Sequence, residues 1–81
     1  MINNKEDENY IYYVIGKNLK KQRKLKGLTQ EKLAEKSNYS LSFIGNLESQ
    51  KVFQTLSVGS AYHLAKTLDI PIEELFKDID N

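Results

Sequence analysis

Of the side chains that most often carry catalytic or metal chemistry, cysteine and histidine are almost absent from this chain of 81 residues. It has no cysteine, which excludes disulfides and thiolate metal sites, and its one histidine is His63. A lone imidazole cannot build a histidine-rich metal site, and no nucleophile set, phosphate loop or paired carboxylates can be assembled. We therefore expect no catalysis, metal, cofactor or small-molecule ligand, and a structural role for His63.

The chemistry that remains is electrostatic, and it lies in the distribution of charge. The net charge is only +1. Residues 17–36, however, hold eight basic residues against two glutamates, a net +6, whereas residues 69–81 hold one lysine against five acidic residues, a net −4. Clustered lysines can contact the phosphates of a nucleic acid, but they are also common on an ordinary solvated helix face. Charge alone leaves both interpretations open.

The chain is long enough to form one small domain. It has no internal repeat or flexible linker, and its longest apolar run, residues 10–15, is far shorter than the roughly 20 residues of a membrane span. The polar residues 1–8 predict a mobile N-terminal arm, residues 9–77 the folded domain, and residues 78–81 an acidic C-terminal tail. The expectation is a cytoplasmic protein without membrane contact.

The spacing of apolar residues predicts five short helices and no strand, which is an all-α fold. The first helix covers residues 9–26 and ends at Gly27, the second runs from the N-cap Thr29 to Ser37, the third from the N-cap Ser40 to about Glu48, the fourth follows the N-cap Ser57, and the fifth starts at Pro71. The expected inward residues of the fourth helix are Val58, Ala61, Leu64, Ala65 and Leu68. Residues 49–56 are expected to form a loop.

The second and third predicted helices have the most informative geometry. Each has about eight residues, and the three residues 38–40 separate them, which is the helix-turn-helix arrangement. Two crossing helices need a small residue at their contact, an apolar side chain that meets it, and a turn residue that tolerates positive φ. Ala34, Ile44 and Asn38 supply these at the required spacing.

With these elements in place, the sequence resembles the Cro/repressor-type helix-turn-helix family of the xenobiotic-response-element type. The resemblance covers about residues 11–76, and its most typical segments are Ile15 to Leu19 with Arg23, Gly27 to Ala34, Ile44, Leu47-Glu48, Leu64 to Ile70, and Glu74 to Phe76. It implies a compact five-helix, lambda-repressor-like DNA-binding domain. It also implies a sequence-specific transcriptional regulator that binds double-stranded DNA as a homodimer on a pseudo-palindromic operator, similar to restriction–modification controller proteins and phage repressors.

The same resemblance implies roles for individual side chains. It assigns contacts with DNA bases to Ser40, Leu41, Ser42 and Asn46. It assigns contacts with the DNA backbone to Thr29, Gln30, Tyr39, Phe43, Ser49 and Lys51. Asn46 is the leading base reader, because an amide can form two hydrogen bonds with adenine. The alternative for the four base contacts is an ordinary solvent-exposed helix surface. For Thr29 and Gln30 the alternative is a solvated helix start with an N-cap, and for Phe43 it is packing within the domain.

Arg23 lies on the inward stripe of the first helix, where a charged group needs a partner. The resemblance supplies Glu48, at the end of the third helix, as that partner. We therefore expect a largely buried Arg23–Glu48 ion pair with a structural role. Contact between Arg23 and a DNA phosphate is the alternative interpretation.

Exposed apolar residues on so small a domain usually meet a partner, which predicts a dimer surface. The expected interface includes Val52, Phe53, Ile70, Pro71 and Phe76. Two other functions remain open for this sequence. One is an antitoxin or another protein-interaction module built on the same fold, and the other is a helical scaffold with a solvated lysine face.

Overall fold

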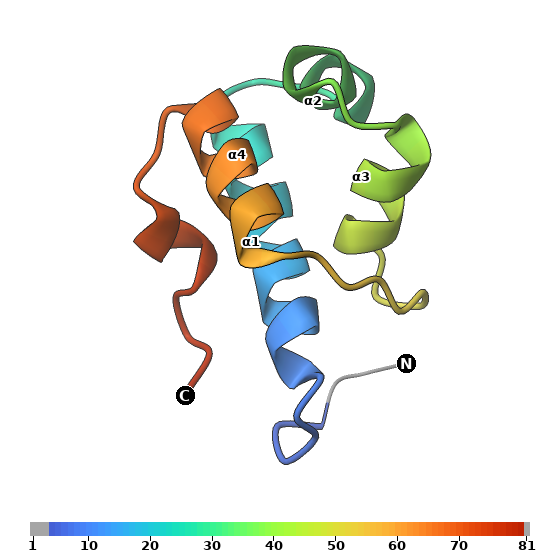
Figure 1. Ribbon diagram of the computed structural model, residues 1–81, viewed down its shortest axis with the longest axis vertical. Coiled ribbons are helices and arrows are strands. Elements are labelled where there is room, and N and C mark those ends of the chain that lie inside the picture. Colours follow the sequence, from blue (N-terminus) through green and yellow to red (C-terminus); the bar gives the residue numbers. More distant parts are fainter. Residues whose placement is uncertain (1–3, 81) are drawn as a thin grey trace.

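The computed structural model describes residues 4–80 (Figure 1). Within this range the chain forms four α-helices and one short 3-10 helix: α1 (Tyr10–Leu25), α2 (Gln30–Ser37), α3 (Leu41–Glu48), α4 (Val58–Leu68) and η1 (Ile72–Leu75). No strand occurs between residues 4 and 80. The prediction of a compact all-α fold is confirmed.

Local sequence signals set the ends of these helices. The hydroxyl groups of Thr29, Ser40 and Ser57 each accept a hydrogen bond from the backbone N–H three residues further on. Gly27, with a φ of 72°, and Asn38, with a φ of 64°, adopt the left-handed conformation that lets the chain turn after α1 and α2. The caps proposed from the sequence therefore delimit α2, α3 and α4.

The fifth predicted helix is not an α-helix, so the structure has four α-helices rather than five. After Pro71 the chain makes a single 3-10 turn, Ile72–Leu75. Asn18 on α1 then donates from Nδ2 to the carbonyl oxygens of Leu75 and Lys77, both at 2.9 Å. These two hydrogen bonds tie the segment after η1 to α1, and residues 76–80 continue as bends and turns, not as an α-helix.

The helices enclose one hydrophobic core. Figure 1 shows α4 lying in front of α1, with α2 at one end of the pair and α3 at its side. Gly16 marks the closest approach of α1 to α3, since a Cβ atom there would collide with the backbone carbonyl of Leu47. The buried core residues are Ile15, Leu19, Leu33, Ala34, Ile44, Leu47, Ala61, Leu64, Ala65, Leu68 and Leu75. The core therefore fixes α3 against α1 and α2.

The prediction that Val58 faces the core is wrong, because its side chain is 75% exposed. Val58 is the first residue of α4, and the buried stripe of this helix begins at Ala61, almost one turn later. The side chain of the first residue of a helix can extend past the edge of the core that the following turns of the helix cover. Val58 therefore adds apolar surface to the outside of the domain.

The two ends of the chain are only partly described. Of the predicted N-terminal arm, residues 1–3 lie outside the described residues. Residues 4–8 form, together with Asn9, hydrogen-bonded turns that lead into α1. Of the predicted acidic tail, residue 81 lies outside the described residues. Ile79 packs against the core, which attaches this part of the tail to the domain.

Candidate DNA-binding interface

α2 and α3 form a helix-turn-helix. α2 ends at Ser37, Asn38 takes the left-handed conformation, and α3 begins at Leu41. Ala34 and Ile44 are both buried in the shared core, as two closely crossing helices require. This packing presents the outer face of α3 at the side of the molecule (Figure 1).

The exposed face of α3 carries no charge. Ser40, Leu41 and Ser42 are exposed around its first turn, and Asn46 is half-buried one turn later. The only charged residue of α3, Glu48, is 4% exposed. The surface of this helix therefore offers hydroxyl and amide groups for hydrogen bonding, together with one apolar side chain.

The amide of Asn46 is held from the loop that follows α3. Its Nδ2 lies 3.5 Å from Oε1 of Gln54, and Nε2 of Gln54 donates to the carbonyl oxygen of Thr55 at 2.9 Å. One Nδ2 proton of Asn46 thus points to the loop, which leaves Oδ1 and the second proton for another partner. Sequence reasoning missed Gln54, because no local pattern connects a loop residue to a side chain eight positions earlier.

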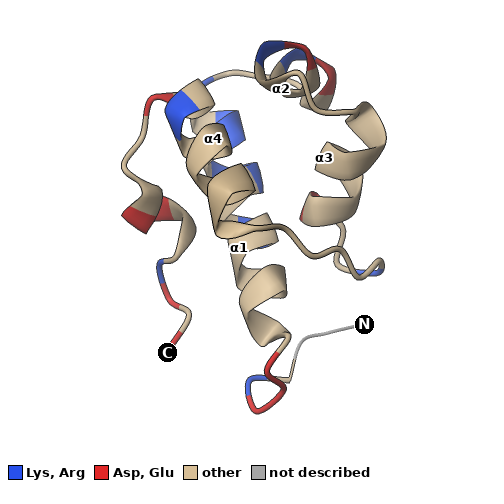
Figure 2. Cartoon of the chain, in the orientation of Figure 1, with Lys and Arg blue, Asp and Glu red and all other residues tan. Residues whose placement is uncertain are grey.

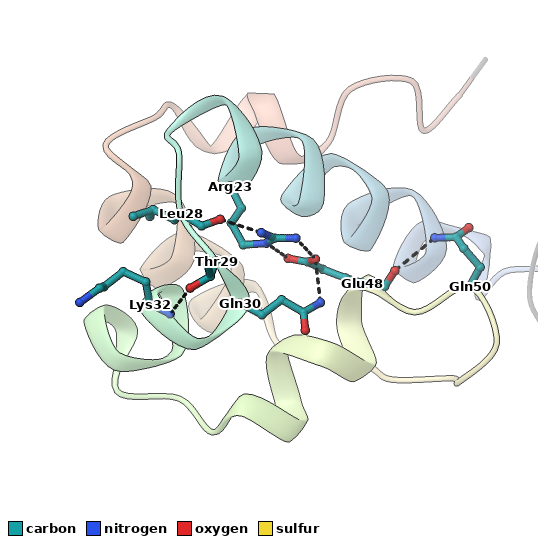
Figure 3. A network of polar contacts seen from close by, with 7 residues as sticks. All are labelled: Arg23, Leu28, Thr29, Gln30, Lys32, Glu48 and Gln50. Atoms are coloured by element: carbon teal, nitrogen blue, oxygen red, sulfur yellow. Dashed lines mark hydrogen bonds and ion pairs between the residues drawn. The ribbon is translucent and has the colours of Figure 1, made fainter.

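The end of α3 is anchored by a buried polar network (Figure 3). Arg23 donates from Nε and Nη2 to the two carboxylate oxygens of Glu48, both at 2.8 Å, and from Nη1 to the carbonyl oxygen of Leu28 at 2.7 Å. The side chains of Arg23 and Glu48 are only 8% and 1% exposed. The hydrogen bonding to Glu48 raises the pKa of Arg23, outweighing burial, which lowers it. The pair joins α1 to α3.

Gln30, the first residue of α2, completes this network. Its Nε2 donates to Oε1 of Glu48 at 3.0 Å, so the carboxylate accepts three hydrogen bonds. The neighbouring Thr29 hydroxyl accepts from the backbone N–H of Lys32 at 3.0 Å, and its own proton remains free to be donated outward. Glu48 therefore fixes the start of α2 against the end of α3.

The other residues assigned to the DNA backbone lie at the two ends of α3. Tyr39 and Phe43 are half-buried near its start, with ring centroids 5.1 Å apart in an edge-on contact. Ser49 and Lys51 follow its last residue, where the Ser49 hydroxyl accepts from the backbone N–H of Lys51 at 3.1 Å. The structure thus brings the sequence-predicted residues to one helix and to the segments that flank it.

Comparison with known proteins agrees with this geometry. Residues 19–75 match the helix-turn-helix family. The chain belongs to this family. A similar solved structure is that of the restriction–modification controller protein C.AhdI from Aeromonas hydrophila, which is 35% identical, has a TM-score of 0.72, and matches over 80% of this chain and 96% of that chain. No curated protein matches the chain.

The family and this structural neighbour identify the protein as a DNA-binding regulator and not an enzyme. The resemblance to the Cro/repressor-type family is confirmed. α3 is the second helix of the helix-turn-helix, and in DNA-binding proteins with this motif the second helix lies in the major groove. Among the described residues, no group of three or more side chains could hold a metal ion. No helix among them is long and apolar enough to cross a membrane.

Charge is distributed unevenly over this helix-turn-helix domain. Figure 2 shows Lys and Arg residues along α1 and on α2, and Asp and Glu residues in the C-terminal segment and in the turn before α1. The lysines of α1 are all exposed. α3 itself contains neither Lys nor Arg. The charge asymmetry along the sequence is therefore also present in the folded molecule, and the exposed face of α3 is neutral.

The residues predicted for a dimer surface lie in two places. Val52 and Phe53, in the loop after α3, are 48% and 50% exposed. Beside η1, Pro71 is exposed, whereas Ile70 and Phe76 are half-buried against the core. The chain thus presents one apolar loop and one partly covered apolar segment.

A hollow lined mainly by apolar side chains lies between the Val52–Phe53 loop and Phe76. The ring of Phe53 lies edge-on to Tyr12, with centroids 5.9 Å apart. Tyr12 and Phe76 both line a hollow of about 110 Å³, whose other lining residues are Ile11, Ile15, Leu56, Ser57, Val58 and Ala61. Together with exposed Val58, this arrangement offers a continuous apolar strip from the loop to η1.

Proposed function

We propose that the protein is a sequence-specific transcriptional regulator of the restriction–modification controller type, which binds double-stranded DNA as a homodimer. The observation that carries the proposal is a recognition helix whose neutral face is exposed while its end is locked by the buried Glu48 network. A reader of base edges needs both properties, accessible donors and acceptors and a rigid support. The similarity to C.AhdI, a restriction–modification controller protein, supports the assignment of type.

On this proposal α3 enters the major groove and its side chains meet base edges. Asn46 pairs with adenine through Oδ1 and the Nδ2 proton that Gln54 leaves free. The hydroxyl groups at the start of the helix donate to or accept from bases, and Leu41 contacts a thymine methyl group. The residues assigned to base reading are Ser40, Leu41, Ser42 and Asn46.

Contacts with the DNA backbone hold the recognition helix in register without reading sequence. The start of α2 offers free backbone N–H groups and the Thr29 proton to a phosphate, and Gln30 stands beside them. Lys51 supplies a positive charge at the other end of α3. The residues assigned to the backbone are Thr29, Gln30, Tyr39, Phe43, Ser49 and Lys51, with Phe43 limited to contacts with sugar.

A homodimer follows from the size of the domain. One recognition helix makes too few contacts for tight specificity, whereas two copies on half-sites about one helical turn apart double them. The proposed interface uses Val52, Phe53, Ile70, Pro71 and Phe76, supported by the apolar strip between the loop and η1. Sedimentation at tens of micromolar is expected to show a dimer that Phe53→Ser weakens. A monomer that also fails to dimerise on its operator would contradict this part.

Selection of bound sequences from a random DNA pool tests the proposed function. The wild-type protein is expected to enrich a palindrome, and Asn46→Ala is expected to relax the preference at one base pair of each half-site. Asn9→Ala is the matched control, because Asn9 is exposed and its side chain makes no capping hydrogen bond. An unenriched pool would contradict sequence-specific binding, and an unchanged preference in Asn46→Ala would remove Asn46 as the reader.

The salt dependence of binding separates phosphate contacts from a merely solvated lysine face. Each phosphate neutralised by a lysine contributes roughly 0.9 to the slope of log K against log salt. Lys51→Ala, which removes one lysine from each protomer, is therefore expected to reduce the slope for a dimer by about 1.8. Lys77→Ala is the control, since Lys77 lies in the acidic C-terminal segment and pairs with Glu74 at 3.1 Å. A slope near zero in the wild type would favour the solvated face.

A further inference from the structure

His63 is the one imidazole of the chain, and the proposed function does not use it. It lies on α4, and its Nε2 is 2.7 Å from the carbonyl oxygen of Ser37, the last residue of α2. Because a carbonyl oxygen only accepts, Nε2 carries a proton and donates it. The bond joins α4 to the end of α2, directly before the turn that leads to α3.

The carbonyl group that His63 reaches needs an outside partner. The last four carbonyl groups of a helix have no partner within the helix, and Ser37 is only 2% exposed, so water has little access to it. The Ser37 hydroxyl meanwhile donates to the carbonyl oxygen of Ala34 at 3.3 Å and accepts from the backbone N–H of Tyr39 at 3.2 Å. His63 therefore completes a set of hydrogen bonds that fixes the backbone of the turn.

Aromatic contacts extend this connection into the recognition helix. The ring of Tyr39 lies edge-on to the imidazole of His63, with centroids 5.2 Å apart, and edge-on to Phe43, at 5.1 Å. Such edge-on pairs are favourable beyond the surface that they bury. Phe43 belongs to the first turn of α3, next to three of the four proposed base contacts. A continuous chain of side-chain contacts thus runs from α4 to the reading end of α3.

The two ends of α3 are held in different ways. The Glu48 network anchors its last turn to α1 and α2, whereas its first turn follows directly from the residues that His63 holds. We infer that His63 is a positioning residue, which sets the orientation of the first turn of α3 and so contributes to operator recognition without touching DNA. This inference rests on the proposed function.

Three variants separate this role from simple loss of a contact. His63→Leu keeps an apolar side chain but removes the donor, and His63→Gln restores an N–H donor on a side chain of similar reach. Thr67→Val is the matched control on the same helix, because the Thr67 hydroxyl donates to a backbone carbonyl within α4, that of His63, at 2.8 Å. Each protein is titrated with the duplex selected by the wild type and with a non-operator duplex.

His63→Leu is expected to bind the operator about tenfold more weakly, as the loss of one such hydrogen bond implies, and to bind the non-operator duplex within about twofold of wild type. His63→Gln is expected to recover most of the operator affinity, and Thr67→Val to match the wild type. Hydrogen exchange is expected to accelerate at residues 39–42 in His63→Leu, and not in Thr67→Val.

Two results would overturn the positioning role. One is a His63→Leu variant whose operator affinity and exchange at residues 39–42 both equal those of wild type. The other is an equal loss of affinity for both duplexes that His63→Gln does not recover, which indicates general loosening of the domain. A wild-type protein that prefers no duplex is a distinct outcome, since it contradicts the proposed function itself.

Discussion

Replacing Glu48 with alanine should remove a large share of the stability of this domain. Glu48 accepts two hydrogen bonds from Arg23 and one from Gln30. Without the carboxylate, a guanidinium that is 8% exposed keeps only the carbonyl oxygen of Leu28 as a partner. Stranding a buried charge in this way costs about 3–5 kcal/mol. A domain of 81 residues has a total stability of only about 4–12 kcal/mol, so this loss is a large fraction of the total.

Thermal unfolding followed by circular dichroism measures this effect. The Tm of Glu48→Ala is expected to fall by roughly 12–40 °C, because a loss of about 3–5 kcal/mol lowers Tm by about 4–8 °C for each kcal/mol. Glu35→Ala is the control, because it breaks an exposed ion pair with Lys32 at 3.5 Å and should change Tm by only a few degrees. The double variant Arg23→Met with Glu48→Leu should regain most of the loss, since no charge is then stranded. A Tm for Glu48→Ala within about 2 °C of wild type would refute the reasoning.

Three further substitutions test the packing of the domain. Gly16→Ala should destabilise the domain by about 1–3 kcal/mol in urea unfolding, because the added Cβ collides with the carbonyl of Leu47; an unchanged midpoint would contradict the close approach of α1 to α3. Gly59→Ala should raise the free energy of unfolding by up to about 1 kcal/mol, because the added carbon meets only a hydroxyl at 3.7 Å; a lower free energy of unfolding would show an unrecognised clash. Asn18→Ala removes two hydrogen bonds to the C-terminal segment, and limited proteolysis there should become faster; equal cleavage rates would mean that the bonds do not hold the segment.

The positions of the four α-helices could be predicted from the sequence because local interactions decide them. A capping hydroxyl needs only the backbone N–H three residues later, and Thr29, Ser40 and Ser57 make these bonds. The left-handed residues Gly27 and Asn38 likewise act within one turn. The helix-turn-helix arrangement and its exposed face follow from these caps together with the buried apolar stripe.

Contacts between distant residues could not be predicted in the same way. A fifth α-helix was expected after Pro71, yet the chain makes a 3-10 turn there, and Asn18, more than fifty positions earlier, donates to the carbonyl oxygens of Leu75 and Lys77. The link from Gln54 to Asn46 and the bond from His63 to Ser37 also depend on how the helices pack. A pattern of residue types does not give the direction in which a polar side chain points. These hydrogen bonds could therefore be found only in the folded structure.

The most direct test of the central claim is a titration of isotope-labelled protein with the selected operator duplex, followed through its backbone amide resonances. If α3 reads the operator, the largest shifts are expected at the start of α2, residues 29–30, and along the turn and exposed face of α3, residues 39–46. Small shifts are expected in α4 and η1. Shifts confined to the lysine face of α1 or to α4, with α3 unchanged, would contradict recognition by α3.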